Sequence, residues 1–194
     1  MSPVVIGFYG SSKAGKTTLI TQLIRRLTDD GFRVATVKQT DKNISMDTKG
    51  KDTWKHSQAG ARIVVLSSPV ETDVIIKKKQ PIREILRRIV GIDSYDCVFV
   101  EGATDPSIPK IRIGTIAKRE HTIKDYRGDV DEIETLIKEK IKENRGRDER
   151  GSVTVVVNGK KVPLTQFPSS MIKNTVVGLL RSLKDVDEIH EVEL

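Results

Sequence analysis

Gly10-Ser11-Ser12-Lys13-Ala14-Gly15-Lys16-Thr17 is the stretch that decides the fold of this chain of 194 residues. It fits the pattern G-x-x-x-x-G-K-[ST], which is typical of a phosphate-binding loop, or P-loop. The apolar residues 4–9 before it predict a strand, and apolar residues at helical spacing over 19–27 predict an amphipathic helix after it. Because the pattern binds phosphate in this strand–loop–helix context, the sequence predicts a nucleotide-binding P-loop.

The fixed positions of the loop each have a chemical role. Glycines let the backbone turn so that successive N–H groups point at phosphate oxygens. Lys16 supplies positive charge to the β- and γ-phosphates, which makes it a candidate catalytic residue, and Thr17 offers its hydroxyl to Mg²⁺. The start of the next helix adds the positive end of its dipole. We therefore expect the phosphates to contact Gly10, Ser11, Ser12, Lys13, Ala14, Gly15, Lys16, Thr17 and Thr18.

A second candidate residue stands at the end of the apolar run 97–100, which predicts a buried strand. Glu101 follows this run, and Gly102 then permits close backbone approach. In a parallel sheet such an acid emerges at the carboxyl edge, where ligands bind. We predict that Glu101 is catalytic and holds Mg²⁺ or orients a water molecule; a solvated acid at a strand end is the alternative.

Strand and helix patterns alternate along residues 1–150. This order predicts an α/β fold of the P-loop NTPase type, with a mostly parallel sheet and helices on both of its faces. The expected strands are 4–9, 32–37, a buried strand at 63–66, 72–76, 97–100 and 110–116. The expected helices are the one after the P-loop, 52–61, 82–90 and 129–144.

The pattern changes after residue 150, so we predict a second, small domain at 151–194. Residues 138–151 are expected to be a helix end followed by a charged linker. Asn158-Gly159 between the β-prone runs 153–157 and 161–165 predicts a hairpin. A helix at 169–183 and a strand at 188–192 complete a ββαβ unit. Such a unit is too small to be stable alone, so we expect an interaction module.

Composition narrows the class of protein. The formal charge is +7, and residues 152–194 carry five basic and five acidic side chains, so the excess lies in the first 151 residues. With 4% aromatic residues and no nucleic-acid-binding motif, the charge favours phosphorylated small molecules over nucleic acid.

No run approaches the roughly 18 apolar residues of a membrane span. The N-terminus lacks the basic region of a signal peptide, and the single cysteine, Cys97, lies in an apolar run. We expect a soluble, cytoplasmic protein in which Cys97 is a buried apolar residue.

At this point the sequence resembles the molybdopterin-guanine dinucleotide biosynthesis protein B (MobB) family. The resemblance rests on 7–20 including the P-loop, on Val37-Lys38-Gln39-Thr40, on 47–54 with Ala59-Gly60-Ala61, and on Val100-Glu101-Gly102 with Pro109-Lys110-Ile111. Members of this family often carry histidines where this chain has Gln39 and Asp41. The segment 47–54 distinguishes the family from other P-loop proteins.

The resemblance implies a homodimer that binds GTP and assists the molybdenum cofactor guanylyltransferase. Thr17 and Glu101 lead us to expect Mg²⁺, and the lack of an obvious arginine finger leads us to expect slow hydrolysis. The resemblance also implies that Lys38, Lys51 and Asp52 lie around the nucleotide, and that Asp47 joins Thr17 and Glu101 at the metal. Two other classes stay open on the residues alone: a small-molecule kinase and a metallochaperone-type GTPase. The preference between GTP and ATP is also open, because the chain lacks the guanine-reading element [NT]-K-x-D.

Overall fold

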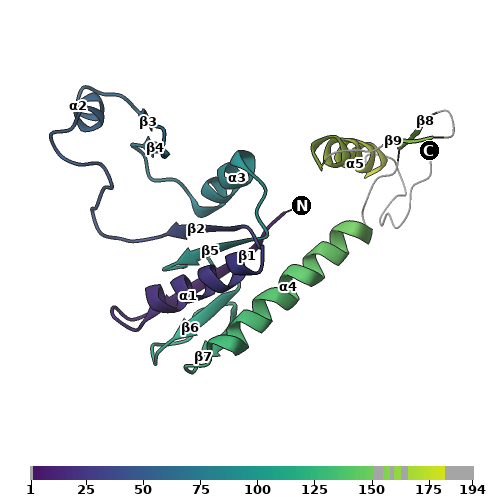
Figure 1. Cartoon of the computed structure of the whole chain (residues 1–194), viewed down its shortest axis with the longest axis horizontal. Coiled ribbons are helices and arrows are strands. Elements are labelled where there is room, and N and C mark those ends of the chain that lie inside the picture. Colours follow the sequence, from purple (N-terminus) through teal and green to yellow (C-terminus); the bar gives the residue numbers. More distant parts are fainter. Residues whose placement is uncertain (1, 151–154, 158–159, 163–165, 182–194) are drawn as a thin grey trace.

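A computed structural model describes residues 2–150, 155–157, 160–162 and 166–181, and strand β1 (Val4–Gly10) lies in the middle of its main sheet (Figure 1). The five strands of this sheet pair in the order β2-β5-β1-β6-β7, and every pairing is parallel. The others are β2 (Val34–Lys38), β5 (Cys97–Glu101), β6 (Lys110–Ile113) and β7 (Thr122–Tyr126). The predicted α/β fold with a parallel sheet is confirmed, and all five carboxyl ends meet at one edge.

Helices cover both faces of the sheet, as predicted. Helices α1 (Lys16–Asp29) and α4 (Val130–Arg150) lie on one face, where their leucines and isoleucines pack against Ile6 and Phe8 of β1. Helix α3 (Ile82–Ile92) lies on the other face, where Ile82 packs against Val100. The apolar positions of α1 recur at helical spacing, and this periodicity gives the helix one buried side.

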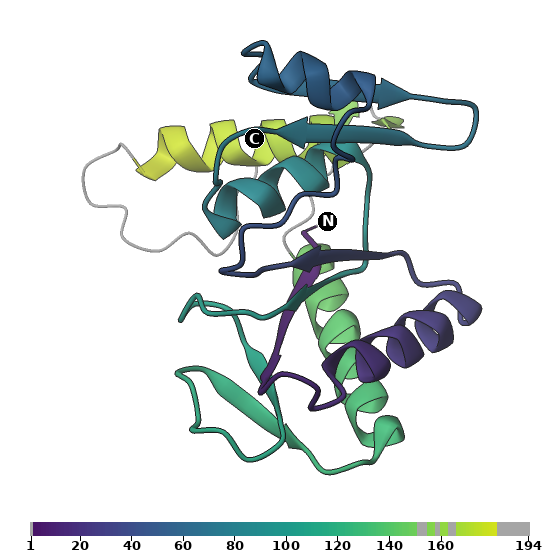
Figure 2. The same ribbon diagram turned by 90° about the vertical axis from the view of Figure 1, so that its left-hand side faces the viewer.

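A separate unit contains α2 (Asp52–Gln58), β3 (Ile63–Ser67) and β4 (Thr72–Ile76). β3 and β4 form an antiparallel hairpin, and Figures 1 and 2 show the unit standing away from the five-stranded sheet. Both strands were predicted, but the expectation that 63–66 is buried was wrong. Val64 is buried, whereas the side chains of Ile63 and Val65 are 57% and 54% exposed. An apolar run indicates a strand, but it does not indicate that the same chain covers both of its faces.

Two other differences concern the far side of the sheet. β7 was not predicted, because this edge strand is short and two of its five residues are charged. The linker expected after about residue 144 is helical as far as Arg150, because α4 continues without a break to that residue. Pairs of opposite charge one turn apart support this polar helix, as between Lys138 Nζ and Glu134 Oε1 at 2.6 Å.

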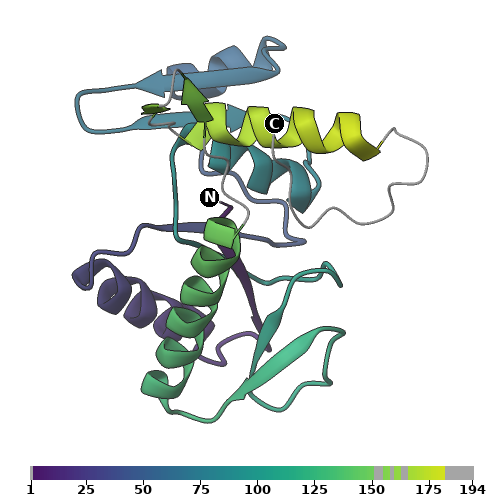
Figure 3. The ribbon, with the colours of Figure 1, turned by 90° about the vertical axis from the view of Figure 1, so that its right-hand side faces the viewer.

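The predicted hairpin and helix of the C-terminal segment are confirmed. β8 (Val155–Val157) pairs antiparallel with β9 (Lys160–Val162), and α5 (Gln166–Arg181) follows. Figure 3 shows α4 running along the sheet and leading into this segment. The strand expected at 188–192 lies outside the described residues. None of the helices in the described part of the chain combines the length and the apolar character needed to cross a bilayer.

Candidate functional site

The P-loop turns sharply between β1 and α1. Lys13 and Gly15 both have left-handed backbones, with φ of 63° and 87°. Such a conformation strains a residue that carries a side chain, so Lys13 occupies a position that the surrounding loop must hold in place. The N–H of Ala14 donates to the carbonyl of Ser11 at 3.3 Å and closes the turn.

Gly10 is required for a different reason from the one that the sequence suggested. Its backbone does not adopt the left-handed region, but a Cβ atom placed there would lie 2.3 Å from the carbonyl oxygen of Ile113 on β6. The first glycine of the motif therefore permits two parallel strands to approach closely at the base of the loop.

The start of α1 is open to an anion. Its N-cap residue is Gly15, so no side chain caps the first N–H groups, and the first turn contains no acidic residue. The helices α2, α3 and α4 each carry an acid in the first turn. The Nζ of Lys16 donates to the carbonyl of Gly10 at 3.1 Å and also to that of Ser11. Unpaired N–H groups, the positive helix end and this ammonium group together favour a phosphate.

Glu101 lies beside the loop and contacts two of the predicted residues. The hydroxyl of Thr17 donates to Glu101 Oε1 at 3.1 Å, and Lys38 Nζ lies 3.7 Å from the same oxygen. Strands β2 and β5 are neighbours and pair Lys38 with Glu101, which places both at the carboxyl edge. The Glu101 side chain is only 16% exposed, so the solvated-acid alternative does not describe it.

This set of donors fits Mg²⁺. A threonine hydroxyl and a carboxylate are hard oxygen ligands, and Mg²⁺ is usually held by one or two such groups together with phosphate oxygens. Within the described ranges, His, Cys, Asp and Glu side chains form no group of three that could hold a metal ion by themselves. Thr17 and Glu101 are therefore the residues that would hold the ion beside a bound nucleotide.

The backbone after Glu101 is packed closely against Gln39, the residue that follows β2, and Gly102 permits this approach as the sequence predicted. Gly102 has φ of 81°, and a Cβ atom there would lie 2.5 Å from the carbonyl oxygen of Gln39. The N–H of Gln39 donates to the carbonyl of Glu101, and the N–H of Gly102 donates to that of Phe8, both at 2.8 Å. These contacts fix the direction in which the chain leaves Glu101.

Three predicted residues belong to the separate α2–β3–β4 unit. Asp47 is almost fully buried, at 1% side-chain exposure; it accepts a hydrogen bond from Thr53 Oγ1 at 2.9 Å and pairs with Lys77 at 3.3 Å. Lys51 and Asp52 lie at the exposed start of α2, where Asp52 pairs with Lys55 at 3.0 Å. The structure does not bring these three side chains into contact with Thr17 or Glu101. Their roles at nucleotide and metal stay predictions.

Two groups of this domain have shifted pKa values through burial. Cys97 is fully buried, and burial raises the pKa of its thiol to about 12, so the thiolate does not form near neutral pH. The prediction of an apolar, unreactive cysteine is consistent with this. Burial also lowers the pKa of Lys110, which has no exposed surface.

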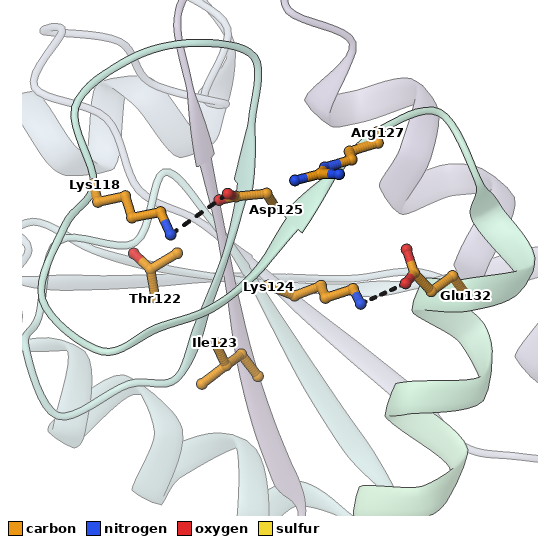
Figure 4. Close-up of a pocket in the computed structure, with 7 residues that line it drawn as sticks. All are labelled: Lys118, Thr122, Ile123, Lys124, Asp125, Arg127 and Glu132. Atoms are coloured by element: carbon orange, nitrogen blue, oxygen red, sulfur yellow. Dashed lines mark ion pairs between the residues drawn. The ribbon is translucent and has the colours of Figure 1, made fainter.

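A cavity of about 330 Å³ lies along the edge strand β7, away from the predicted nucleotide residues (Figure 4). Both of its acidic side chains are paired with lysines of the lining: Lys118 lies 3.5 Å from Asp125, and Lys124 pairs with Glu132. Because none of its lining residues belongs to the P-loop or to the Glu101 group, we assign the chemistry to the carboxyl edge instead.

The central parallel sheet, the loop at the end of β1 and the acid at the end of β5 define an α/β protein of the P-loop class. The chain matches the family model of molybdopterin guanine dinucleotide synthesis protein B (MobB) over residues 5–139. It therefore belongs to the MobB family.

Individual relatives agree with this assignment. A Methanocaldococcus jannaschii protein, named as an adapter of molybdopterin-guanine dinucleotide biosynthesis, is 27% identical over 94% of this chain and 93% of its own length. The Haemophilus influenzae adapter protein of the same biosynthesis is 32% identical over 55% of this chain and 61% of its own length. A crystal structure of molybdopterin-guanine biosynthesis protein B is similar at a TM-score of 0.52 and 27% identity, over 71% of this chain and 99% of that one.

Proposed function

We propose that this protein is a GTP-binding accessory protein of molybdopterin guanine dinucleotide biosynthesis that hydrolyses GTP slowly with Mg²⁺. The observation that carries the proposal is the arrangement at the carboxyl edge, where the uncapped start of α1 carries Lys16 and Thr17, and the Thr17 hydroxyl contacts Glu101. The names of the relatives supply the pathway, because they describe adapter proteins of this biosynthesis.

Binding would use the loop in a simple way. A phosphate seated over α1 accepts hydrogen bonds from the loop N–H groups, and Lys16 exchanges its two loop carbonyls for phosphate oxygens. Thr17 and Glu101 would hold Mg²⁺, and the ion would supply positive charge to the phosphates. Lys38, whose Nζ lies 3.7 Å from Glu101 Oε1, helps to hold that carboxylate in place.

Slow hydrolysis is expected from the residues that make up this site. The group formed by the P-loop, Thr17, Lys38 and Glu101 contains no arginine, and an arginine finger is worth about 10³–10⁵ in rate. Glu101 is the one group here that can orient an attacking water molecule and accept its proton.

The partner and the assembly are further parts of the proposal. We expect a cytoplasmic homodimer that works with the molybdenum cofactor guanylyltransferase. The β3–β4 hairpin supports a dimer, because Ile63, Val65 and Val74 are each more than half exposed on a two-stranded sheet whose edges are open. Light scattering on the full chain would measure the oligomeric state.

Calorimetric titration of the full chain with GTP and with ATP, each with and without Mg²⁺, tests the proposal. We expect GTP to bind more tightly than ATP, and Mg²⁺ to strengthen the binding. Equal or tighter binding of ATP, with fast transfer of its γ-phosphoryl group to a small molecule, would instead indicate the kinase class.

A further inference from the structure

The turn that follows Glu101, residues 102–109, is held from behind by two cationic side chains. Both come from β6 or from the connection between β6 and β7, and neither belongs to the predicted nucleotide site. Arg119 Nη1 donates to the carbonyl of Ala103 at 2.7 Å, and Lys110 Nζ donates to the carbonyl of Ile108 at 2.8 Å. The two bonds therefore fasten the turn near its beginning and near its end.

Arg119 also contacts the other half of the site. Its guanidinium carbon lies 4.9 Å from the centre of the Tyr9 ring, and its backbone N–H donates to the Tyr9 hydroxyl at 2.9 Å. Tyr9 is buried and comes directly before Gly10, the first residue of the P-loop. The Arg119 side chain thus contacts both Tyr9, directly before the P-loop, and Ala103, two residues after Glu101.

Lys110 joins the turn at 102–109 to the connection between β6 and β7. Its Nζ donates a second hydrogen bond, at 3.0 Å, to the carbonyl of Glu120, which neighbours Arg119. Its stem packs over Gly7 of β1, where an added Cβ atom would lie 2.5 Å from Ala103 Cβ and 3.1 Å from Lys110 Cγ. This packing leaves no room for the turn to shift toward β1.

We infer that Arg119, supported by Lys110, is a positioning residue that fixes Glu101 relative to the P-loop. The inference rests on the proposed function, because it assigns Arg119 a role at that same site. Arg119 does not touch the residues that would hold nucleotide or metal; it acts through the backbone at Ala103 and through Tyr9. Mutating a group that holds a metal ligand in place typically lowers metal affinity by about 10- to 100-fold.

The test compares Arg119→Gln with Arg127→Gln in the full chain. Arg127 is an exposed arginine after β7, so its variant makes the same chemical change away from the turn. The first readout is hydrogen exchange of the backbone at 101–109 without nucleotide. The second is the Mg²⁺ concentration that half-saturates the Mg²⁺-dependent part of GTP binding.

We expect Arg119→Gln to speed exchange in the turn and to raise the half-saturating Mg²⁺ concentration about tenfold, the lower end of the effect of losing such a supporting group. GTP affinity without Mg²⁺ should change little, and Arg127→Gln should behave as wild type. In a Glu101→Gln background, Arg119→Gln should have no further effect on the Mg²⁺ dependence, since its action passes through Glu101.

Unchanged exchange, or faster exchange with an unchanged Mg²⁺ dependence, would overturn the inference while leaving the proposed function intact. A wild-type protein that binds no GTP would overturn both. If Arg119→Gln does not fold, Arg119→Lys is the second variant: it keeps the charge but not the planar group over Tyr9, and the same two readouts decide.

Discussion

Glu101 shares one carboxylate oxygen between the Thr17 hydroxyl and the Lys38 ammonium group. Replacing it by glutamine keeps the size of the side chain but removes its charge. The amide still accepts a hydrogen bond from Thr17, whereas it is a poorer metal ligand and cannot take a proton.

We predict that Glu101→Gln lowers the rate of GTP hydrolysis by roughly 10²-fold or more, which is the lower range for loss of a general base. GTP affinity without Mg²⁺ should stay close to that of the wild type. Single-turnover phosphate release together with calorimetry measures both quantities. Equal rates in variant and wild type would remove Glu101 from catalysis.

Asp47 is expected to stabilise the α2–β3–β4 unit, because it contacts Thr53 and Lys77 of that unit. We predict that Asp47→Asn leaves Lys77 without its buried partner and lowers the free energy of unfolding by about 1–3 kcal/mol. Asp52→Asn is the matched control, since Asp52 is 84% exposed and should change stability by less than about 0.5 kcal/mol.

Urea unfolding measures the stability of both variants, and calorimetry with Mg²⁺ measures their nucleotide affinity. If Asp47→Asn keeps its stability but loses Mg²⁺-dependent nucleotide binding, Asp47 has the metal role that the family resemblance implies. The stabilising role predicted for it is then wrong.

The residues of the proposed nucleotide site could be predicted from the sequence where they form, or directly follow, a continuous sequence pattern. The P-loop is one unbroken pattern, and Glu101 is marked by the apolar strand before it. Arg119 carried no such signal, because its role depends on the Tyr9 ring 110 positions earlier in the chain. Only the fold brings these two residues together.

Among the elements, β6 and β7 are joined by a charged side-chain pair in addition to their backbone hydrogen bonds. Arg112 Nε and Nη2 each donate to a different oxygen of Asp125, both at 2.8 Å, so the contact is bidentate. This hydrogen bonding lowers the pKa of the Asp125 carboxyl below its usual value of 3.8.

The lowered pKa sets the direction of an acid dependence. The stabilisation by Asp125 is fully present above 3.8, the value for the unfolded chain, and is lost as pH falls through the lower pKa of the folded state. We predict that Asp125→Asn lowers the melting temperature at neutral pH, and that this difference shrinks as the pH falls below 3.8. Thermal unfolding across this range measures it, and a difference that grows in acid would contradict the assignment.

Elements with a uniform local signal were found from the sequence, and elements that depend on their neighbours were not. The apolar strand β5 and the amphipathic helix α3 are each indicated by the types and spacing of their own residues. β7 does not, because it is held by Arg112 and by the edge of β6. The end of α4 was taken for a linker because its charges indicate solvent exposure equally well in a helix and in a loop.

At the scale of the whole molecule, the family model ends at residue 139, whereas the M. jannaschii relative matches 94% of the chain. The match to this relative therefore extends into the C-terminal segment, beyond the end of the family model. Its role as a separate interaction module stays a proposal.

We predict that a chain ending at residue 150 keeps its nucleotide affinity, because every residue of the proposed site lies before that point. Solubility, oligomeric state or partner binding should change instead. Light scattering and nucleotide titration of the folded truncated chain measure these properties. Loss of nucleotide binding by that chain would place part of the site in the C-terminal segment.

The central claim is that the loop between β1 and α1 binds the phosphates of a nucleoside triphosphate. Calorimetric titration of Lys16→Ala beside the wild type, with circular dichroism to show that both are folded, tests it most directly. We expect the variant to bind GTP about 10- to 150-fold more weakly, the effect of losing a charge-assisted hydrogen bond of about 1.5–3 kcal/mol. A folded Lys16→Ala protein that binds GTP as tightly as the wild type would contradict it.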